Sequence, residues 1–208
     1  IVPHGPAVTA AGKRIAVLLN VAHPDELGPL DPAMCDGIGL VRTELFFADG
    51  PPDEATQYAL YRRIVEWASG RPVVIRTLDA GADKPVAGLT RGGESNPFLG
   101  LRGVRLSLAH PDVFSVQLRA LVRAGAHGPL KIMLPMVTVP GELAAARALL
   151  DSAAAAVSLP APPLGMMVEV PAAALTLETF DAAFFSIGSN DLVQYLTASA
   201  RDIASVAA

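Results

Sequence analysis

The chain has 208 residues, of which 51% are hydrophobic and 17% charged, as is typical of one soluble α/β domain with a sizeable core. The formal net charge of −4 argues against a nucleic-acid-binding protein, which normally carries a basic patch. The single cysteine, Cys35, excludes an internal disulfide framework and fits a reducing cytoplasm, and no apolar run is long enough to cross a membrane.

Short apolar runs alternate with helical patterns along the chain. The runs are bounded by turns, so we interpret them as buried parallel strands, at 14–21, 37–43, 73–77, 130–136, 164–169 and 184–188. Helical patterns lie between them, near 24–26, at 51–70, through Leu108, at 113–123 and at 141–156. Six alternations of this kind predict a right-handed parallel winding in one domain over 14–208, preceded by a lead-in at 1–13.

Charged and amide side chains stand where four of these runs end. Arg42, Arg76 and Glu169 each end a different run, and Asn190-Asp191 follows the last one. The active sites of (β/α) barrels lie at the C-terminal ends of the strands. We therefore expect these side chains to meet in one site, next to a long polar loop at 79–96.

The strand count predicts an incomplete barrel. A closed (β/α)8 TIM-type barrel has eight strands and typically about 250 residues, so this chain would cover about the first six β/α units. The outer strands would then expose apolar edges, which either later strands or another chain would cover. The absence of Met at position 1 also suggests a segment of a longer protein.

Several motifs in register resemble a known family. GIGLVRTELFF at 37–47 resembles the signature of the phosphoenolpyruvate-utilising enzymes. The segments at 74–84 and 96–102 are similar to Enzyme I of the bacterial sugar phosphotransferase system, a phosphoenolpyruvate–protein phosphotransferase. MVEVPA at 167–172 and SIGSNDLVQY at 186–195 continue the resemblance in the same order.

The resemblance implies a reaction and its partners. Enzyme I transfers the phosphoryl group of phosphoenolpyruvate, with Mg²⁺, to a histidine on a separate phosphohistidine domain and releases pyruvate. The phosphoryl group then passes to a small histidine-containing phosphocarrier protein. By the same resemblance we expect a cytoplasmic protein that forms a homodimer if the fold is complete, and that functions in sugar transport or in a regulatory pathway.

The resemblance also implies a set of site residues. Glu169 and Asp191 would hold Mg²⁺, which takes oxygen ligands and often one or two carboxylates. Arg42 and Arg76 would grip the phosphoryl group, since planar guanidiniums match phosphate oxygens bidentately. The full substrate-binding set would be Arg42, Arg76, Lys84, Arg102, Asn190 and Arg201. Four of these would also act in catalysis: Arg42, Arg76, Asn190 and Arg201.

Other polar residues are assigned supporting roles or none. We expect Glu44 and Asp79 to orient Arg42 and Arg76 rather than to react. The family's general acid is a cysteine in a seventh strand, which this chain lacks, and Cys35 does not match it. The chain is therefore expected to be the substrate-binding portion and inactive alone.

Two alternatives stay open at this point. A Mg²⁺-dependent aldolase or lyase acting on pyruvate-like enolates would also use a strand-end Glu and Asp, although an enolate needs fewer cations. A non-catalytic phosphoenolpyruvate-binding paralogue would keep the binding residues without the reaction. Phosphate transfer to an added phosphohistidine domain would separate the enzyme from both.

Overall fold

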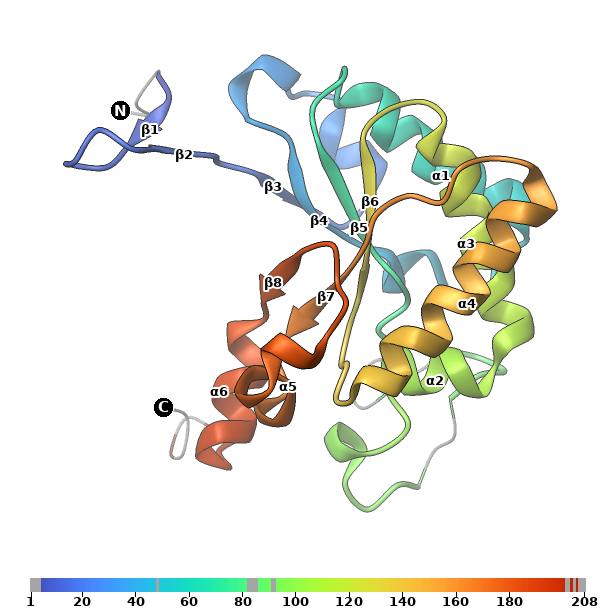
Figure 1. The fold of residues 1–208 in the computed structure, drawn as a ribbon. Helices are drawn as coiled ribbons and strands as arrows, with labels where there is room; N and C mark the ends of the chain where they lie inside the picture. The colour runs from blue at the N-terminus through green and yellow to red at the C-terminus, as the bar shows by residue number, and fades with distance from the viewer. Residues whose placement is uncertain are drawn as a thin grey trace.

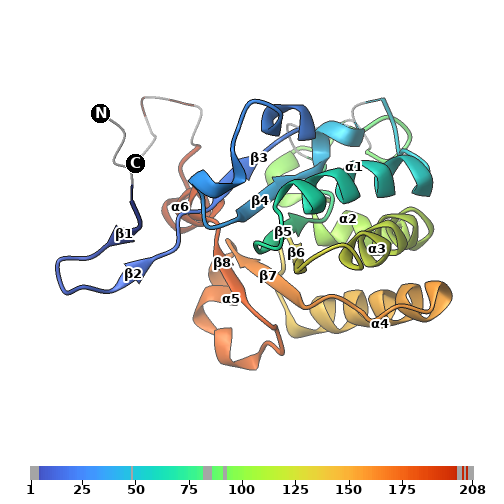
Figure 2. The same cartoon turned by 90° about the horizontal axis from the view of Figure 1, so that it is seen from above.

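A computed structural model describes residues 5–47, 49–81, 86–90, 93–200, 203 and 205. Its main element is a sheet of six parallel strands in chain order, which curls into part of a barrel (Figures 1 and 2). The strands are β3 (Leu19–Val21), β4 (Ile38–Arg42), β5 (Val73–Arg76), β6 (Leu130–Leu134), β7 (Leu164–Val168) and β8 (Phe185–Ile187). The predicted α/β class and the parallel sheet are confirmed.

Helices connect the strands, and three of them, α1, α3 and α4, lie along the outer face of the sheet (Figure 2). The α-helices are α1 (Glu54–Trp67), α2 (Val104–Ala109), α3 (Pro111–Gly125), α4 (Pro140–Val157), α5 (Pro171–Leu175) and α6 (Ser189–Thr197). Short 3₁₀ turns are η1 (Pro24–Leu27), η2 (Pro32–Met34), η3 (Thr43–Phe47), η4 (Pro97–Leu99) and η5 (Leu177–Thr179). Within the described part of the chain, none of the helices combines the length and apolar character needed to span a membrane.

Helix starts follow local capping rules. The carboxylate of Asp53 accepts a hydrogen bond of 2.8 Å from the N–H of Thr56, so α1 begins at Glu54. The predicted start at Pro51 is therefore about one turn early, and the prolines precede the helix. At α4 the carboxylate of Glu142 accepts from the N–H of Val139 at 3.1 Å, which satisfies a donor before the first turn.

The core lies between the sheet and the outer helices. Strand residues such as Ile38, Ile75 and Ile132 are fully buried, as expected for parallel strands covered on their outer face. Tyr61 of α1 and Leu118 of α3 are buried against them. The strand ends that carry charged residues are thus anchored by a continuous apolar layer.

The first predicted strand, at 14–21, is wrong over its first half. Arg14–Ile15 forms β2, which pairs antiparallel with β1 (Ala7–Val8) in a hairpin that stands away from the main sheet (Figure 1). Asp36, just before β4, holds the following residues: its carboxylate accepts from Arg14 at 2.5 Å and from the N–H of Val17 at 2.8 Å, and its own N–H donates to the carbonyl of Val17 at 2.9 Å. The boundary at 13/14 between a lead-in and the domain stays a prediction.

The two outer strands of the sheet differ in exposure. On β8, Phe185 is 41% and Ile187 is 76% exposed, as expected for an edge strand with no further partner among the described residues. On β3, however, Val21 is buried and Leu19 packs against the core. Of the two outer strands, β8 therefore exposes more apolar surface than β3, and closure by eight strands stays a prediction.

Candidate active site

The ends of the strands surround a pocket of about 340 Å³. The residues that line it lie in β3, in the C-terminal parts of β4, β5, β7 and β8, or directly after the last three of these strands, and they are mostly polar. They are Asn20, Leu40, Arg42, Arg76, Asp79, Met167, Glu169, Ile187, Gly188, Ser189, Asn190 and Asp191. Parallel strands end at the same edge of a sheet, so residues more than 100 positions apart share one pocket.

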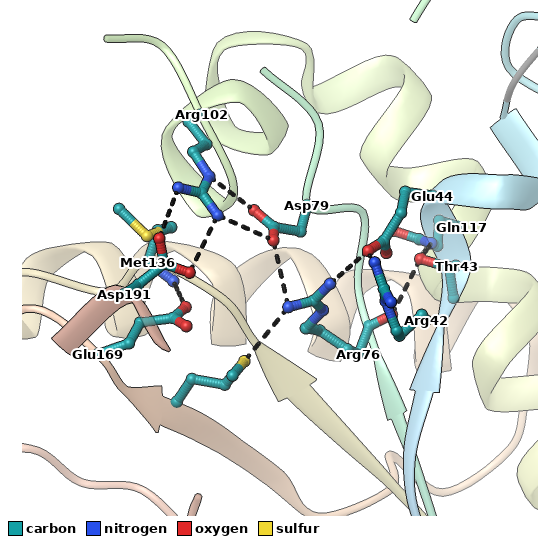
Figure 3. Close-up of polar contacts among 11 residues, drawn as sticks. Arg42, Thr43, Glu44, Arg76, Asp79, Arg102, Gln117, Met136, Glu169 and Asp191 are labelled. Atoms are coloured by element: carbon teal, nitrogen blue, oxygen red, sulfur yellow. Dashed lines mark hydrogen bonds and ion pairs between the residues drawn. The ribbon is translucent and has the colours of Figure 1, made fainter. Parts of the chain in front are cut away.

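Glu44 joins the two arginines of β4 and β5. Its Oε1 accepts from Nε of Arg42 at 3.2 Å and from Nη2 of Arg76 at 2.5 Å (Figure 3). Glu44 belongs to η3, directly after β4, and its side chain is 5% exposed. The expected contact between Glu44 and these guanidiniums is therefore present, and it holds both of them in one orientation.

Asp79 extends this arrangement to a third arginine, Arg102. Its Oδ2 lies 3.1 Å from Nη1 of Arg76, and its Oδ1 lies 3.2 Å from Nε of Arg102. Arg102 in turn makes a bidentate pair with Asp191, at 2.9 and 3.2 Å. Positive and negative side chains thus alternate from Arg42 to Asp191 across the strand ends (Figure 3).

Arg102 is placed behind the pocket rather than on its wall. The residue is 1% exposed and is not among the described residues that line the cavity. Burial opposes its charge, but Asp79 and Asp191 outweigh burial and raise the pKa of its guanidinium. The structure therefore places Arg102 between two carboxylates, and its contact with substrate stays a prediction.

Arg76 has a donor that no described residue satisfies. Its Nε is buried and has no hydrogen-bond partner among the described residues, although Nη1 and Nη2 pair with Asp79 and Glu44. An unsatisfied buried donor on a charged group is costly, so such a group points to an anionic ligand. Arg42, by contrast, keeps a side chain that is 42% exposed toward the same pocket.

Glu169 is the buried carboxylate of the opposite wall. It follows β7, is 1% exposed, and accepts a hydrogen bond of 2.7 Å from the N–H of Met136. Burial, reinforced by the charges of Asp79 and Asp191, raises the pKa of Glu169 to about 7, although the Met136 N–H and Arg76 act in the opposite direction. A nearby cation would stabilise the ionised carboxylate of Glu169 and lower this pKa.

Glu169 and Asp191 fit a magnesium ion. Both line the pocket, and Mg²⁺ is commonly bound by one or two carboxylates together with substrate phosphate oxygens and water. Asp191 also accepts from Arg102, but a carboxylate offers about four lone-pair sites, so it can serve both partners. Among the described residues no cluster of three or more His, Cys, Asp or Glu could hold a metal by itself.

The first turn of α6 completes the pocket. Ser189, Asn190 and Asp191 are its first three residues, and all of them line the cavity. The N-terminal end of a helix carries a partial positive charge and N–H groups without partners inside the helix. Asn190 is exposed there, so its side-chain amide can reach a ligand in the pocket.

The pocket brings together five of the residues chosen from the sequence: Arg42, Arg76, Glu169, Asn190 and Asp191. Two others, Lys84 and Arg201, lie outside the described residues. The sequence analysis missed Met136, Gly188 and Gln117. A signal for Gln117 exists, because Phe114, Leu118 and Leu121 mark the buried face of α3 and place an amide among them.

Comparisons with known proteins identify the family of this chain. The family described as PEP-utilising enzyme, PEP-binding domain, matches residues 1–208. The chain belongs to this family. The resemblance stated from the motifs is thereby confirmed for the phosphoenolpyruvate-binding domain.

Several relatives of this PEP-binding domain are named for phosphoryl transfer. The chain is 45% identical to the phosphoenolpyruvate-protein phosphotransferase of Haloferax volcanii, over 95% of this chain and 37% of that protein. It is 41% identical to the protein of that name from Geobacillus stearothermophilus, over 95% of this chain and 36% of that protein. It is 40% identical to the multiphosphoryl transfer protein of Rhodobacter capsulatus, over 94% of this chain and 24% of that protein. The chain thus spans between about a quarter and two fifths of these relatives.

Proposed function

We propose that this chain is the substrate-binding portion of a phosphoenolpyruvate–protein phosphotransferase. It would bind phosphoenolpyruvate with Mg²⁺ and support transfer of the phosphoryl group to a protein histidine, with release of pyruvate. The observation that carries the proposal is the pocket itself, in which the buried, incompletely satisfied guanidinium of Arg76 faces the carboxylates of Glu169 and Asp191. The names of the relatives favour phosphoryl transfer over the aldolase or lyase alternative.

The arginines would bind the phosphoryl end of the substrate. Negative charge spreads over the equatorial oxygens as the phosphoryl group moves, so positioned cations stabilise the transition state. Arg42 and Arg76 are suited to this because Glu44 fixes both guanidiniums before the ligand arrives. Glu169 and Asp191 would hold Mg²⁺, which would supply further positive charge to the phosphoryl oxygens when bound.

The remaining donors would hold the rest of the ligand. Asn190 and the first turn of α6 offer N–H groups to the carboxylate end of phosphoenolpyruvate. In the reaction, the enol oxygen–phosphorus bond breaks as a phosphorus–nitrogen bond forms on the acceptor histidine. The enolate left behind gains a proton at carbon and becomes pyruvate. We assign the general acid for that step to a part of the protein outside this chain.

We infer the wider setting from the same assignment. The six strands would belong to a (β/α)8 barrel, which the exposed edge of β8 supports because further strands would cover it. The acceptor would be a phosphohistidine domain, followed by a small histidine-containing phosphocarrier protein. We further propose a cytoplasmic homodimer that functions in sugar transport, with Lys84 and Arg201 adding positive charge at the site.

Calorimetric titration of phosphoenolpyruvate into this chain, with and without Mg²⁺, tests the proposal. We expect Mg²⁺-dependent binding that Arg76→Met weakens by at least about tenfold, since hydrogen bonds to charged groups contribute about 1.5–3 kcal/mol. Arg147→Met is the matched control, because Arg147 lies on α4 and donates to the carbonyl of Asp181, away from the pocket. A folded parent chain that binds no phosphoenolpyruvate would refute the proposal.

A second experiment separates the enzyme from a non-catalytic binding protein. The chain, extended to the length of its relatives, is mixed with labelled phosphoenolpyruvate and a phosphohistidine domain. Label on the histidine of the acceptor supports the phosphotransferase. Binding without any transfer supports the non-catalytic paralogue.

A further inference from the structure

A buried amide lies beneath the two arginines of the pocket. Gln117 belongs to α3, is 1% exposed, and has apolar neighbours on the same helix face at Phe114, Leu118 and Leu121. Figure 3 shows it beside Thr43, at the end of the site that holds Arg42 and Arg76. Buried amides are normally kept where their hydrogen bonds are satisfied, so the partners of this one indicate its role.

The partners of Gln117 belong to both arginine-bearing segments. Its Oε1 accepts from the backbone N–H of Leu78 at 3.1 Å, two residues after Arg76. Its Nε2 donates to Oγ1 of Thr43 at 3.4 Å, one residue after Arg42. The hydroxyl of Thr43 then donates to the backbone carbonyl of Arg76 at 3.0 Å. One amide thus connects the residues that follow β4 to those that follow β5.

This connection begins where the sheet ends. Arg42 and Arg76 are the last paired residues of β4 and β5. Beyond that pair, Thr43 and Gln117 provide side-chain bonds between the two segments, in place of the strand pairing. The relative position of the two guanidiniums therefore depends on side-chain hydrogen bonds made just behind them.

We propose that Gln117 is a positioning residue that sets the spacing of Arg42 and Arg76, so that both guanidiniums reach one phosphoryl group. The proposal rests on the proposed function, because it assigns a role within the same phosphate-binding site. Gln117 does not line the pocket and acts only through its neighbours. Misplacement of a group in an active site by about 1 Å can lower the reaction rate by about 100-fold. A small shift of either segment should therefore have a measurable effect on the ligand.

Three variants separate positioning from stability. Gln117→Met keeps the length of the side chain and removes all three hydrogen bonds. Thr43→Val removes the hydroxyl that reaches the carbonyl of Arg76. Tyr61→Phe is the matched control, because the Tyr61 hydroxyl is equally buried and also accepts from Gln117, at 3.1 Å, but leads to Gln57 of α1 instead of the strand ends.

The first readout compares two ligands on each folded variant. Binding of phosphoenolpyruvate should depend on the arginines, whereas binding of Mn²⁺ alone should depend on Glu169 and Asp191 on the other side of the pocket. We expect Gln117→Met and Thr43→Val to raise the Kd for phosphoenolpyruvate by about tenfold or more, while the Kd for Mn²⁺ changes by less than about twofold. Tyr61→Phe should leave both values within about twofold of the parent. Equal effects of Tyr61→Phe and Gln117→Met on phosphoenolpyruvate would overturn the proposal.

The second readout does not need a ligand. In ¹⁵N-labelled chain, the Nε–H resonance of Arg76, assigned with Arg76→Lys, reports the surroundings of that guanidinium directly. We expect it to shift in Gln117→Met and Thr43→Val but not in Tyr61→Phe. If the parent binds no phosphoenolpyruvate, the proposed function fails while this resonance still decides the role of Gln117. If Gln117→Met does not fold, Thr43→Val carries the same comparison, and an unmoved resonance there overturns the proposal.

Discussion

Alanine at Gly188 should disable the proposed metal site by displacing Glu169. Gly188 lies between β8 and α6, and a Cβ added there would lie 2.5 Å from Oε2 and 2.8 Å from Cβ of Glu169. Its φ of −93° suits alanine, so the contacts of the added Cβ are the main effect. Because Cβ of Glu169 is fixed by its own backbone, that contact also requires a small backbone shift. Carbon–oxygen contacts need about 3.5 Å, so the carboxylate has to move by roughly 1 Å.

A displacement of that size exceeds what a metal site tolerates. Mg²⁺ requires oxygen ligands within about 0.2 Å of their ideal distance, so the affinity should fall by about 10- to 100-fold. The move also breaks the hydrogen bond from Met136 to Glu169 and leaves a buried N–H unsatisfied, which costs about 1–3 kcal/mol of stability.

Titration of Mn²⁺, followed by calorimetry or by the spectrum of the free ion, measures the loss of metal affinity. Gly141→Ala is the control, because a Cβ at Gly141 meets nothing within 4 Å and the residue lies in the first turn of α4. Urea unfolding of both variants shows that the chain remains folded. If Gly188→Ala binds Mn²⁺ as tightly as Gly141→Ala does, Glu169 is not a metal ligand in the position described.

Three further substitutions test other parts of the site. Arg42→Ala should abolish binding of phosphoenolpyruvate yet change the free energy of unfolding by less than about 1 kcal/mol, because the side chain is 42% exposed; an unchanged Kd would contradict its role. The pKa of Glu169 is about 7 in the fold and 4.5 ordinarily, so metal-free chain should lose up to about 3 kcal/mol of stability as the pH rises from 5 to 8. Glu169→Gln should flatten that dependence in urea unfolding, and an equally steep profile would disprove the assignment. Gly103→Ala should destabilise the fold by about 1–3 kcal/mol, since φ is 58° and the added Cβ would lie 2.8 Å from Cβ of Met136; a variant as stable as the parent would show that this turn relaxes freely.

The site residues at the ends of the strands could be predicted from the sequence. Arg42, Arg76 and Glu169 each follow an apolar run, and parallel strands in chain order bring such residues to one edge. Arg102 could not be placed in the same way. An arginine in a sequence motif can bind either a phosphate ligand or the carboxylates of the protein. Only the fold shows that Asp79 and Asp191 surround Arg102.

The remaining differences come from hydrogen bonds between distant residues. The run at 14–21 has the composition of one strand, but its first two residues pair with Ala7–Val8 in a hairpin and only Leu19–Val21 join the parallel sheet. Val17 is 53% exposed as a result, so apolar character there does not indicate burial. Gln117 could have been noticed as an amide on the apolar face of α3, but its partners lie on segments 39 and 74 residues away.

The alternation of charge across the strand ends has a consequence for the order in which ligands enter. Among the described residues, three guanidiniums face four carboxylates: Arg42, Arg76 and Arg102 against Glu44, Asp79, Glu169 and Asp191. With Glu169 ionised, this part of the pocket carries a slight excess of negative charge, so an anion that arrives alone meets no net attraction. A divalent cation reverses that sign. In the proposed function, the arginines would give the site its shape for phosphate, and the cation would determine when an anion can enter.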